Sequence, residues 1–297
     1  MTDTSSSKYI IELQNVNFVY GEGTPFRSEA LVDVSVGIER GTVTGIIGHT
    51  GSGKSTLVQL FNGLIKPQSG TVMLDGRDIW ADPKKIGEVR FRVGLVFQYP
   101  EYQLFEETVR RDIAFGPRNM GLSEDEIERR VSEAMTFVGL DEKLLDASPF
   151  ELSGGQKRRV AIAGVIAMEP EVLVLDEPAA GLDPMGREEI LGGIWSYQRR
   201  KRSTVVIVSH SMEDMARFCD RLVVMCGGRV SMTGTCSEIF RHADMLTEIG
   251  LDIPQITRLV LALRARGVDI DTDIYTVEQA KAATEQIIKN KRSGSKC

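Results

Sequence analysis

The residues from Gly48 to Thr56 have the types and the spacing to hold a polyphosphate. They fit the pattern G-x-x-x-x-G-K-[ST], in which glycines let consecutive backbone N–H groups turn inward around phosphate oxygens. Lys54 supplies a mobile positive charge, and the Ser55 hydroxyl can bind Mg²⁺. The loop consists of Gly48, His49, Thr50, Gly51, Ser52, Gly53, Lys54, Ser55 and Thr56. It is therefore a candidate nucleotide-binding site.

The segments that flank this loop are those that a phosphate-binding loop, or P-loop, requires. Residues 42–47 before it are apolar and β-branched, which predicts a buried strand. After it, apolar residues recur at helical spacing from Leu57 to Leu64 and stop before Pro67. A glycine turn that only caps a helix is the alternative. The order of strand, loop and helix favours a P-loop, because the helix N-terminus adds a positive end to the cradle.

Three other apolar segments are followed by polar residues that could act beside the P-loop. These are residues 93–97 before Gln98, residues 172–175 before Asp176 and Glu177, and residues 204–208 before Ser209 and His210. Open α/β sheets bind ligands at the carboxyl ends of their strands, so we expect these side chains to gather at one edge. Taken singly, a strand-end Gln or His is often only a loop former, and two acids are often only solvated. Side chains alternate along a strand, so Asp176 and Glu177 point in different directions. Beside a P-loop, one of them can bind Mg²⁺ while the other faces a water.

A second glycine motif, Ser153-Gly154-Gly155-Gln156, opens a predicted helix that is apolar over much of residues 160–167. The free N–H groups and the dipole of a helix start can hold an anion, and a plain glycine N-cap is the alternative. One chain with one P-loop seldom needs two phosphate cradles. The motif therefore suggests that it grips the nucleotide of a second subunit.

The remaining pattern predicts an α/β protein. Apolar and polar residues alternate in segments 9–20 and 30–39, which is typical of antiparallel strands with one solvent-exposed face. Because these strands precede the buried one, we expect a mixed sheet. Residues 123–139 predict a helix that begins with a capping box of Ser123 and Glu126.

The sequence does not assign a function to two further segments, residues 99–116 and the loop at residues 21–25. Residues 99–116 mix Pro, aromatic and acidic residues and predict a surface insertion. Tyr20 and Phe26 flank the predicted loop at residues 21–25, and either ring could lie against a nucleotide base. Either ring could equally pack on an edge strand.

The composition narrows the class of protein. The formal net charge of −6 argues against non-specific nucleic-acid binding. The four cysteines show no CxxC pairing, which favours reduced thiols over a zinc site or a disulfide framework. Residues 1–8 are polar, so we expect a disordered start and no signal peptide. No stretch has the uncharged length to cross a bilayer, so a role at a membrane requires another chain to span it.

The C-terminal residues 241–297 differ from the rest. They contain apolar positions at helical spacing near residues 256–263 and a predicted last helix at 276–289. The segment is too short for a large core of its own. It could serve oligomerisation or regulation, or it could be a helix pair that only covers the main sheet.

Taken in order, these motifs resemble those of the ATP-binding-cassette (ABC) ATPases from about Ile10 to Gly234. Leu152-Ser153-Gly154-Gly155-Gln156 is the signature of that family, and Asp176-Glu177-Pro178, Gly181-Leu182-Asp183 and His210 follow it in the family's order. More narrowly, residues 97–105 and 112–117 resemble the ATPases of energy-coupling factor transporters. Gly48-His49-Thr50 and the tail after residue 240 fit the same group.

The resemblance implies a P-loop NTPase fold. This is a RecA-like mixed sheet with helices on both faces, an antiparallel β subdomain, an inserted helical subdomain and a small helical appendage. It places the ATPase domain at residues 9–240, the helical subdomain at about 99–168, and an appendage for dimerisation at 241–297.

The resemblance also implies a role for each site residue, with ATP and Mg²⁺ as ligands. The loop amides and Lys54 bind the phosphates, Ser55 and Asp176 hold Mg²⁺, Gln98 senses the metal and the water, Glu177 is the general base, and His210 contacts the γ-phosphate. Ser153, Gly154, Gly155 and Gln156 complete the site of the other subunit, Asp183 communicates between sites, and Tyr20 stacks on adenine. The one departure from the family's pattern is Ala179-Ala180, which removes a hydroxyl and leaves these roles intact.

By the same resemblance, the chain powers uptake of a vitamin or a transition-metal ion. Its expected partners are a second ABC ATPase in a head-to-tail dimer, a transmembrane coupling protein and a substrate-binding membrane component, with no nucleic acid. We expect a peripheral position on the cytoplasmic face of the membrane. The alternative is a soluble ABC ATPase in assembly, repair or translation. Such chains usually carry two cassettes or a long coiled coil, and this sequence shows neither.

Overall fold

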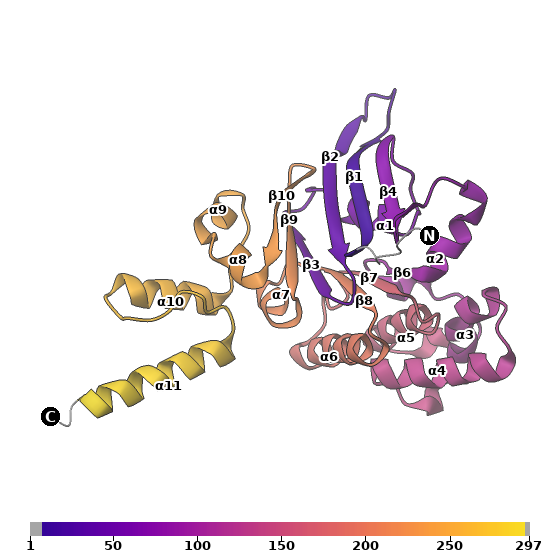
Figure 1. Ribbon diagram of the computed structural model, residues 1–297. Coiled ribbons are helices and arrows are strands. Elements are labelled where there is room, and N and C mark those ends of the chain that lie inside the picture. Colours follow the sequence, from indigo (N-terminus) through magenta and orange to yellow (C-terminus); the bar gives the residue numbers. More distant parts are fainter. Residues whose placement is uncertain (1–7, 295–297) are drawn as a thin grey trace, which may run out of the picture.

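Two sheets form the centre of the structure, a computed structural model that describes residues 8–294 (Figure 1). The first is antiparallel with the order β2-β1-β4-β5, and the second has the order β10-β9-β3-β8-β7-β6. The first sheet contains β1 (Tyr9–Tyr20), β2 (Ser28–Glu39), β4 (Ser69–Leu74) and β5 (Arg77–Asp78). The second contains β3 (Val43–Gly48), β6 (Val93–Val96), β7 (Val172–Asp176), β8 (Thr204–Val208), β9 (Arg221–Cys226) and β10 (Arg229–Thr235).

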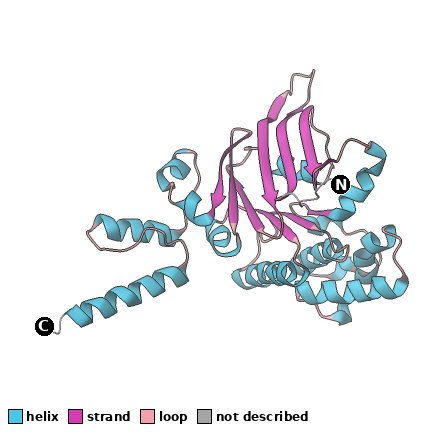
Figure 2. Cartoon of the chain, in the orientation of Figure 1, coloured by secondary structure: helices cyan, strands magenta, loops and turns pink. Residues whose placement is uncertain are grey.

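The six-stranded sheet is covered on both faces, which explains its unbroken apolar strands (Figure 2). Successive side chains of β3 enter different cores. Ile46 packs toward the antiparallel sheet and α1 (Lys54–Phe61), and Ile47 packs toward the helices on the other face. Other connections between strands contain η1 (Pro83–Lys85), α2 (Ile86–Arg92), α6 (Pro184–Lys201) and α7 (Met212–Phe218). The predicted P-loop NTPase fold is confirmed.

From their position in the sequence, we expected the two N-terminal strands to join the P-loop sheet and make it mixed. They do not join it. They pair with each other and with β4, for example Ile11 with Leu74, in a sheet of their own. The antiparallel member of the P-loop sheet is instead β10, which returns from β9 through Gly227 and Gly228, both at positive φ. Alternation indicates a strand with one wet face, but it does not say which strand lies beside it.

A group of helices follows β6. It contains η2 (Pro100–Gln103), α3 (Val109–Asn119), α4 (Glu124–Val138), η3 (Glu142–Leu144), η4 (Pro149–Glu151) and α5 (Gly154–Ile166). The prediction of a surface insertion at residues 99–116 is wrong for its second half. Val109, Ile113 and Ala114 are fully buried in α3, which packs on α5. Their helical spacing is hidden in the sequence by the acids and aromatic residues around them.

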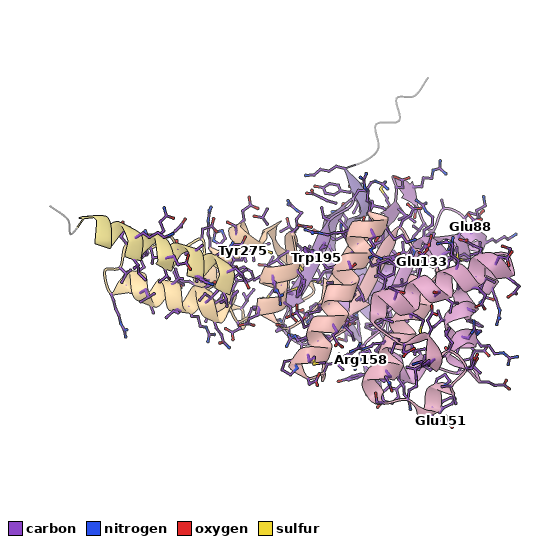
Figure 3. The ribbon with its side chains drawn as sticks, turned by 90° about the horizontal axis from the view of Figure 1, so that it is seen from below. Glu88, Glu133, Glu151, Arg158, Trp195 and Tyr275 are labelled. Carbon is purple, nitrogen blue, oxygen red and sulfur yellow. The ribbon has the colours of Figure 1, made fainter. Side chains whose placement is uncertain are left out.

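The C-terminal helices divide between two cores. Hydrophobic residues of α8 (Cys236–Phe240) and α9 (Ala243–Glu248) belong to the main core, which extends to Ile253. Helices α10 (Gln255–Ala265) and α11 (Val277–Gly294) share a small core around Val260 and project from the body. Tyr275 lies at the junction, with its ring 5.9 Å from that of Phe240 (Figure 3). The expected disorder at 1–8 falls mainly on residues outside the described range.

No helix within residues 8–294 is long and apolar enough to cross a membrane.

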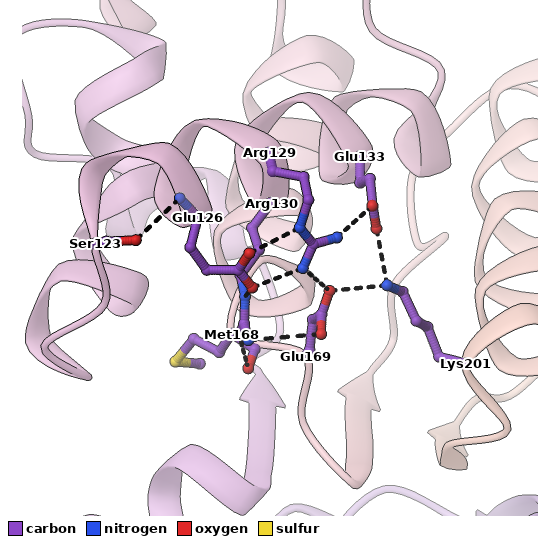
Figure 4. Close-up of polar contacts among 8 residues, drawn as sticks. All are labelled: Ser123, Glu126, Arg129, Arg130, Glu133, Met168, Glu169 and Lys201. Carbon is purple, nitrogen blue, oxygen red and sulfur yellow. Dashed lines mark hydrogen bonds and ion pairs between the residues drawn. The ribbon is translucent and has the colours of Figure 1, made fainter.

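Of the predicted capping box at the start of α4, only half forms. The Ser123 hydroxyl accepts the Glu126 N–H at 3.4 Å, but the Glu126 carboxylate binds Arg129 and Arg130 instead (Figure 4). The charged guanidinium groups are stronger donors than the backbone N–H of Ser123.

An ion network anchors α4 to the rest of the chain (Figure 4). Arg129 and Arg130 reach Glu169, which follows α5, and Lys201 at the end of α6 lies 2.8 Å from both Glu133 and Glu169. Glu169 has a φ of 52°, a conformation uncommon for a residue with a side chain. The network therefore fixes the helical group against the end of α6.

Candidate nucleotide-binding site

Four neighbouring parallel strands bring the predicted site residues together. In the order β3-β8-β7-β6, each strand ends at the same edge and is followed by a polar group. These groups surround a cavity of about 350 Å³. Its lining consists of Tyr20, Ser28, Glu29, Ala30, Thr50, Gly51, Gly53, Lys54, Ser55, Thr56, Gln98, Asp176, Glu177 and His210. Of these, Ser28, Glu29 and Ala30 escaped the sequence analysis, because an edge strand carries no motif.

The P-loop backbone takes a shape that only glycine allows at Gly53. This residue has a φ of +98°, and a Cβ atom there would lie 2.5 Å from the carbonyl oxygen of Ala30. Gly48 is similarly crowded, because its Cβ would lie 2.4 Å from the Ser52 hydroxyl oxygen. The loop is held in this shape by a hydrogen bond from the Ser52 N–H to the His49 carbonyl at 3.1 Å. The free N–H groups that follow open α1, where the helix dipole favours an anion.

Lys54 is a buried charge whose partners are backbone carbonyls. Its Nζ donates to the carbonyl oxygens of Gly48 at 2.6 Å and His49 at 3.0 Å. Burial lowers the pKa of Lys54, and the negative charges of Glu177 and Asp176 oppose that shift. A phosphate at the loop would supply the full counter-charge that this ammonium group lacks.

The two acids at the end of β7 occupy different environments. Asp176 is the last residue of β7, and burial raises its pKa while a hydrogen bond from the Ser55 hydroxyl opposes the shift. Glu177, the residue after the strand, has a φ of 52°, and both carboxylates line the same cavity. Burial, followed by the negative charge of Asp176, raises the pKa of Glu177 to about 7. The two carboxylates therefore differ in the causes that shift their pKa values.

The side chains of Glu177 and His210 lie next to each other at the cavity. The Nε2 atom of His210 lies 3.4 Å from the Oε1 atom of Glu177. That oxygen is buried and makes no hydrogen bond with any residue in the described part of the chain. Burial and the charge of Lys54 lower the pKa of His210, which favours its neutral form. An acceptor without a donor suits a water molecule that approaches from the cavity.

The donor set beside the P-loop fits Mg²⁺. The hydroxyl of Ser55 and the carboxylate of Asp176 are hard oxygen ligands already in hydrogen-bond contact, and Gln98 lines the same cavity. Mg²⁺ in nucleotide sites takes one or two protein oxygens and completes its shell with phosphate and water. The residues present are therefore those that a nucleotide-bound Mg²⁺ would need.

The signature residues lie outside this cavity. Ser153 caps α5, and Ser153 and Gln156 hydrogen-bond each other's backbone N–H at 3.3 and 3.0 Å. Asp183 caps α6 by accepting the Gly186 N–H at 2.8 Å. Gly155 lies close to Leu182, so the starts of α5 and α6 share one face. These residues form a group separate from the residues that line the nucleotide cavity of this chain.

Of the two aromatic candidates, only Tyr20 lines the cavity. Its ring packs edge-on against Phe18, and its hydroxyl lies 3.2 Å from that of Thr56. Phe26 is 86% exposed at the tip of the β1–β2 loop. The sequence did not distinguish Tyr20 from Phe26 as the ring that contacts the base, because both residues flank the same loop.

Comparisons with known proteins agree with this geometry. A sequence model of the family described as "ABC transporter" matches residues 31–180. The energy-coupling factor transporter ATP-binding protein EcfA2 of Caldanaerobacter subterraneus subsp. tengcongensis is 55% identical over 91% of this chain and 95% of that protein. The protein of the same name from Clostridium tetani is 54% identical over 95% and 98%.

Solved structures show the same relationship. CbiO1 from Clostridium perfringens, part of the ABC transporter complex CbiONQ, has 43% identity and a TM-score of 0.72, covering 85% of this chain and 99% of its own. A dimeric post-hydrolysis state of the ATP-binding cassette MJ0796 with ADP and phosphate has 29% identity and a TM-score of 0.69, covering 76% and 98%. The chain therefore belongs to the ABC transporter ATPases and, within them, to the energy-coupling factor transporter ATP-binding proteins.

Proposed function

We propose that this chain binds and hydrolyses ATP as one of two cassettes that drive an energy-coupling factor transporter. The observation that carries the proposal is the meeting of four strand ends in one cavity. A phosphate cradle, a lysine, two acids and a histidine are the parts that P-loop ATPases use to position ATP and a water. The names of the relatives, which are transporter ATP-binding proteins, support a role in transport.

The chemistry that these residues support is the attack of a water on the γ-phosphorus of ATP. Lys54 would exchange its two carbonyl partners for phosphate oxygens. Glu177 accepts the proton of the water, for which a pKa of about 7 suits a base near neutral pH. As the new P–O bond forms, the bond to the bridging oxygen breaks and ADP leaves with its electron pair. His210 contacts the γ-phosphate and orients Glu177.

Ser55 and Asp176 would hold Mg²⁺, with Gln98 beside them. When bound, Mg²⁺ supplies positive charge that offsets the charge of the β- and γ-phosphates. Ser55 is exposed at the cavity, whereas Asp176 is buried behind it. The aspartate therefore positions the Ser55 hydroxyl, and Gln98 lines the same cavity beside them.

The separate location of the signature residues supports a head-to-tail pair of cassettes. None of residues 152–156 lines the cavity of this chain. Two large apolar side chains, Phe150 and Met185, are 65% and 70% exposed at the starts of η4 and α6. Exposed apolar groups beside the capped starts of α5 and α6 suit a face that another chain covers. That chain is a second copy or a paralogous cassette.

A groove that is lined in part by Gln103, Leu104 and Phe105, a few residues after Gln98, supports docking of a membrane partner. It has a volume of about 330 Å³, and it lies between α2, α3 and α5. Phe105 and Phe115, which stand edge-to-face at 4.9 Å, line it and are about half exposed. A short apolar helix from a transmembrane coupling protein fits such a groove. The vitamin or transition-metal ion is then bound by a substrate-binding membrane component, and this chain sits peripherally on the cytoplasmic face.

The proposal is tested by purifying the full chain from its native membranes in mild detergent. We expect polytopic membrane proteins and a second cassette to co-purify, and the complex to release phosphate from ATP. A complex made only of soluble proteins would contradict the role in transport. Absence of ATP hydrolysis from both the complex and the paired cassettes would contradict the ATPase itself.

A further inference from the structure

Arg158 joins three segments that are distant in the sequence. It lies in the second turn of α5 and is only 4% exposed (Figure 3). Its Nε and Nη2 atoms donate to the two carboxylate oxygens of Glu101 at 3.1 and 2.8 Å, and its Nη1 atom donates to the carbonyl oxygen of Ala180. A guanidinium group bound to a carboxylate by two hydrogen bonds is geometrically rigid. The position of Ala180 is therefore tied to that of Glu101.

Ala180 closes the turn that presents Glu177. The Ala180 N–H donates to the carbonyl oxygen of Glu177 at 3.2 Å, and the Glu177 N–H donates to that of Val208 at 3.0 Å. Glu177 adopts a positive φ, which a residue with a side chain keeps only when its surroundings hold it there. A displacement of Ala180 therefore displaces the carboxylate that faces the cavity.

Glu101 lies at the other end of this connection, in η2 beside the apolar groove. The backbone before it is fixed, because Tyr99 has a φ of 56° and Pro100 is buried. After it, the N–H groups of Phe105 and Glu106 donate to the Asp112 carboxylate of α3 at 3.2 and 3.0 Å. A helix that enters the groove would therefore press on a stiff segment whose carboxylate is bound to Arg158.

We propose that Arg158 is a positioning residue that transmits the seating of a membrane partner from Glu101 to the turn of Glu177. Arg158 is not among the residues that line the nucleotide cavity, so it would act on the rate through Ala180 and not by contact with ATP. The trigger, a membrane partner in the groove, rests on the proposed function. The link from Arg158 to Glu177 lies within this chain.

Three variants separate the two halves of this link. Arg158→Lys keeps the charge but cannot bind both carboxylate oxygens and the Ala180 carbonyl together. Glu101→Gln keeps the shape of the carboxylate and leaves the bond from Arg158 to Ala180 in place. Arg159→Lys is the matched control, because Arg159 is the next residue of α5 and binds Glu189 and the carbonyls of Val138 and Gly139 instead.

The experiment measures ATP hydrolysis by the full chain paired with its second cassette, with and without the co-purified membrane proteins. We expect Arg158→Lys to lower kcat about tenfold in both preparations and to leave the KM for ATP within about twofold, because a misplaced base loses rate and not binding. Glu101→Gln should keep the kcat of the paired cassettes within about twofold and lose most of the change that the membrane proteins cause. The control should match wild type in both preparations.

Thermal unfolding of each variant identifies one that fails to fold, since removing one partner of a buried ion pair is destabilising. If Arg158→Lys is unfolded, Glu101→Gln decides the result. An unchanged kcat in folded Arg158→Lys, or an equal loss in Arg159→Lys, would overturn the proposal. Loss of the membrane proteins from Glu101→Gln on purification would also overturn it, because Glu101 would then be a docking contact. If wild type retains no membrane protein, the transport role fails, and the kcat of the paired cassettes still tests the link to Glu177.

Discussion

The Nε2 atom of His210 and the Oε1 atom of Glu177 lie 3.4 Å apart, on side chains that follow the neighbouring strands β8 and β7. Their backbones are also joined, because the Glu177 N–H donates to the carbonyl of Val208. A carboxylate and a histidine that follow two hydrogen-bonded strands keep a fixed separation. The strand pairing therefore positions Glu177, the proposed base, relative to His210.

Replacing Glu177 with Gln should stop hydrolysis but not ATP binding. The amide cannot accept the proton of the attacking water, and a general base contributes about 10²–10⁴-fold to such a step. Phosphate release should fall by at least about a hundredfold, and paired cassettes should accumulate with ATP bound. Single-turnover kinetics and size-exclusion chromatography with ATP measure both effects. Glu188→Gln, the same exchange in an exposed ion pair of α6, is the control. Equal turnover of Glu177→Gln and wild type would remove Glu177 from the role of base.

The same substitution should stabilise the unliganded protein in a pH-dependent way. Burial and the charge of Asp176 raise the folded-state pKa of Glu177 from 4.5 to about 7, so ionisation of this group opposes folding. Its contribution to stability is intact below pH 4.5, falls as the pH rises toward 7, and stays lost above pH 7. Glu177→Gln should therefore raise the free energy of unfolding by about 1–3 kcal/mol at pH 8 and by little at pH 4.5. Denaturation of Glu177→Gln and wild type at the two pH values measures this difference in the free energy of unfolding. An equal increase at both pH values would show that ionisation of Glu177 does not cause the stabilisation.

The motifs correctly predicted which strand-end residues lie together, because each motif is a local pattern at the end of a strand. Gln98, Asp176, Glu177 and His210 meet because β3, β8, β7 and β6 are adjacent and parallel, which is the arrangement that buried apolar strands favour. What the sequence could not supply was the pairing of its alternating strands. It also could not show that apolar positions in α3 face α5, because charged and aromatic neighbours hide their spacing.

The buried pair of Glu101 and Arg158 was not predicted for a similar reason. Each residue is charged and stands among other polar residues, which in a sequence is typical of a solvated surface. Only the packing of η2 on α5 buries Arg158, covers most of the Glu101 side chain and makes the two residues partners. A pair that forms between distant segments leaves no periodic signal, so it has to be read from the structure.

Tyr20 and Phe26 should differ in their effect on nucleotide affinity. Tyr20 lines the cavity with 44% of its surface exposed, whereas Phe26 points into solvent. Tyr20→Ala should raise the KM for ATP about five- to tenfold through loss of a stacking ring, and Tyr20→Phe should stay near wild type. Phe26→Ala, the control, should have no effect. Binding of a fluorescent ATP analogue measures the affinity of all three variants. If Phe26→Ala weakened binding and Tyr20→Ala left it unchanged, the assignment of the stacking ring would be reversed.

The ion network around Lys201 should contribute to stability, unlike an isolated surface pair (Figure 4). Lys201 is partly buried between Glu133 and Glu169, so Lys201→Gln removes two ion pairs at once. We expect a loss of about 1 kcal/mol in the free energy of unfolding by urea. Lys143→Gln, whose pair with Asp141 is largely exposed at 3.7 Å, should cost less than about 0.5 kcal/mol. A double-mutant cycle with Glu133→Gln separates the ion pair from the effect of a cation at the end of α6. A coupling energy of zero would show that the pair of Lys201 with Glu133 does not contribute to stability.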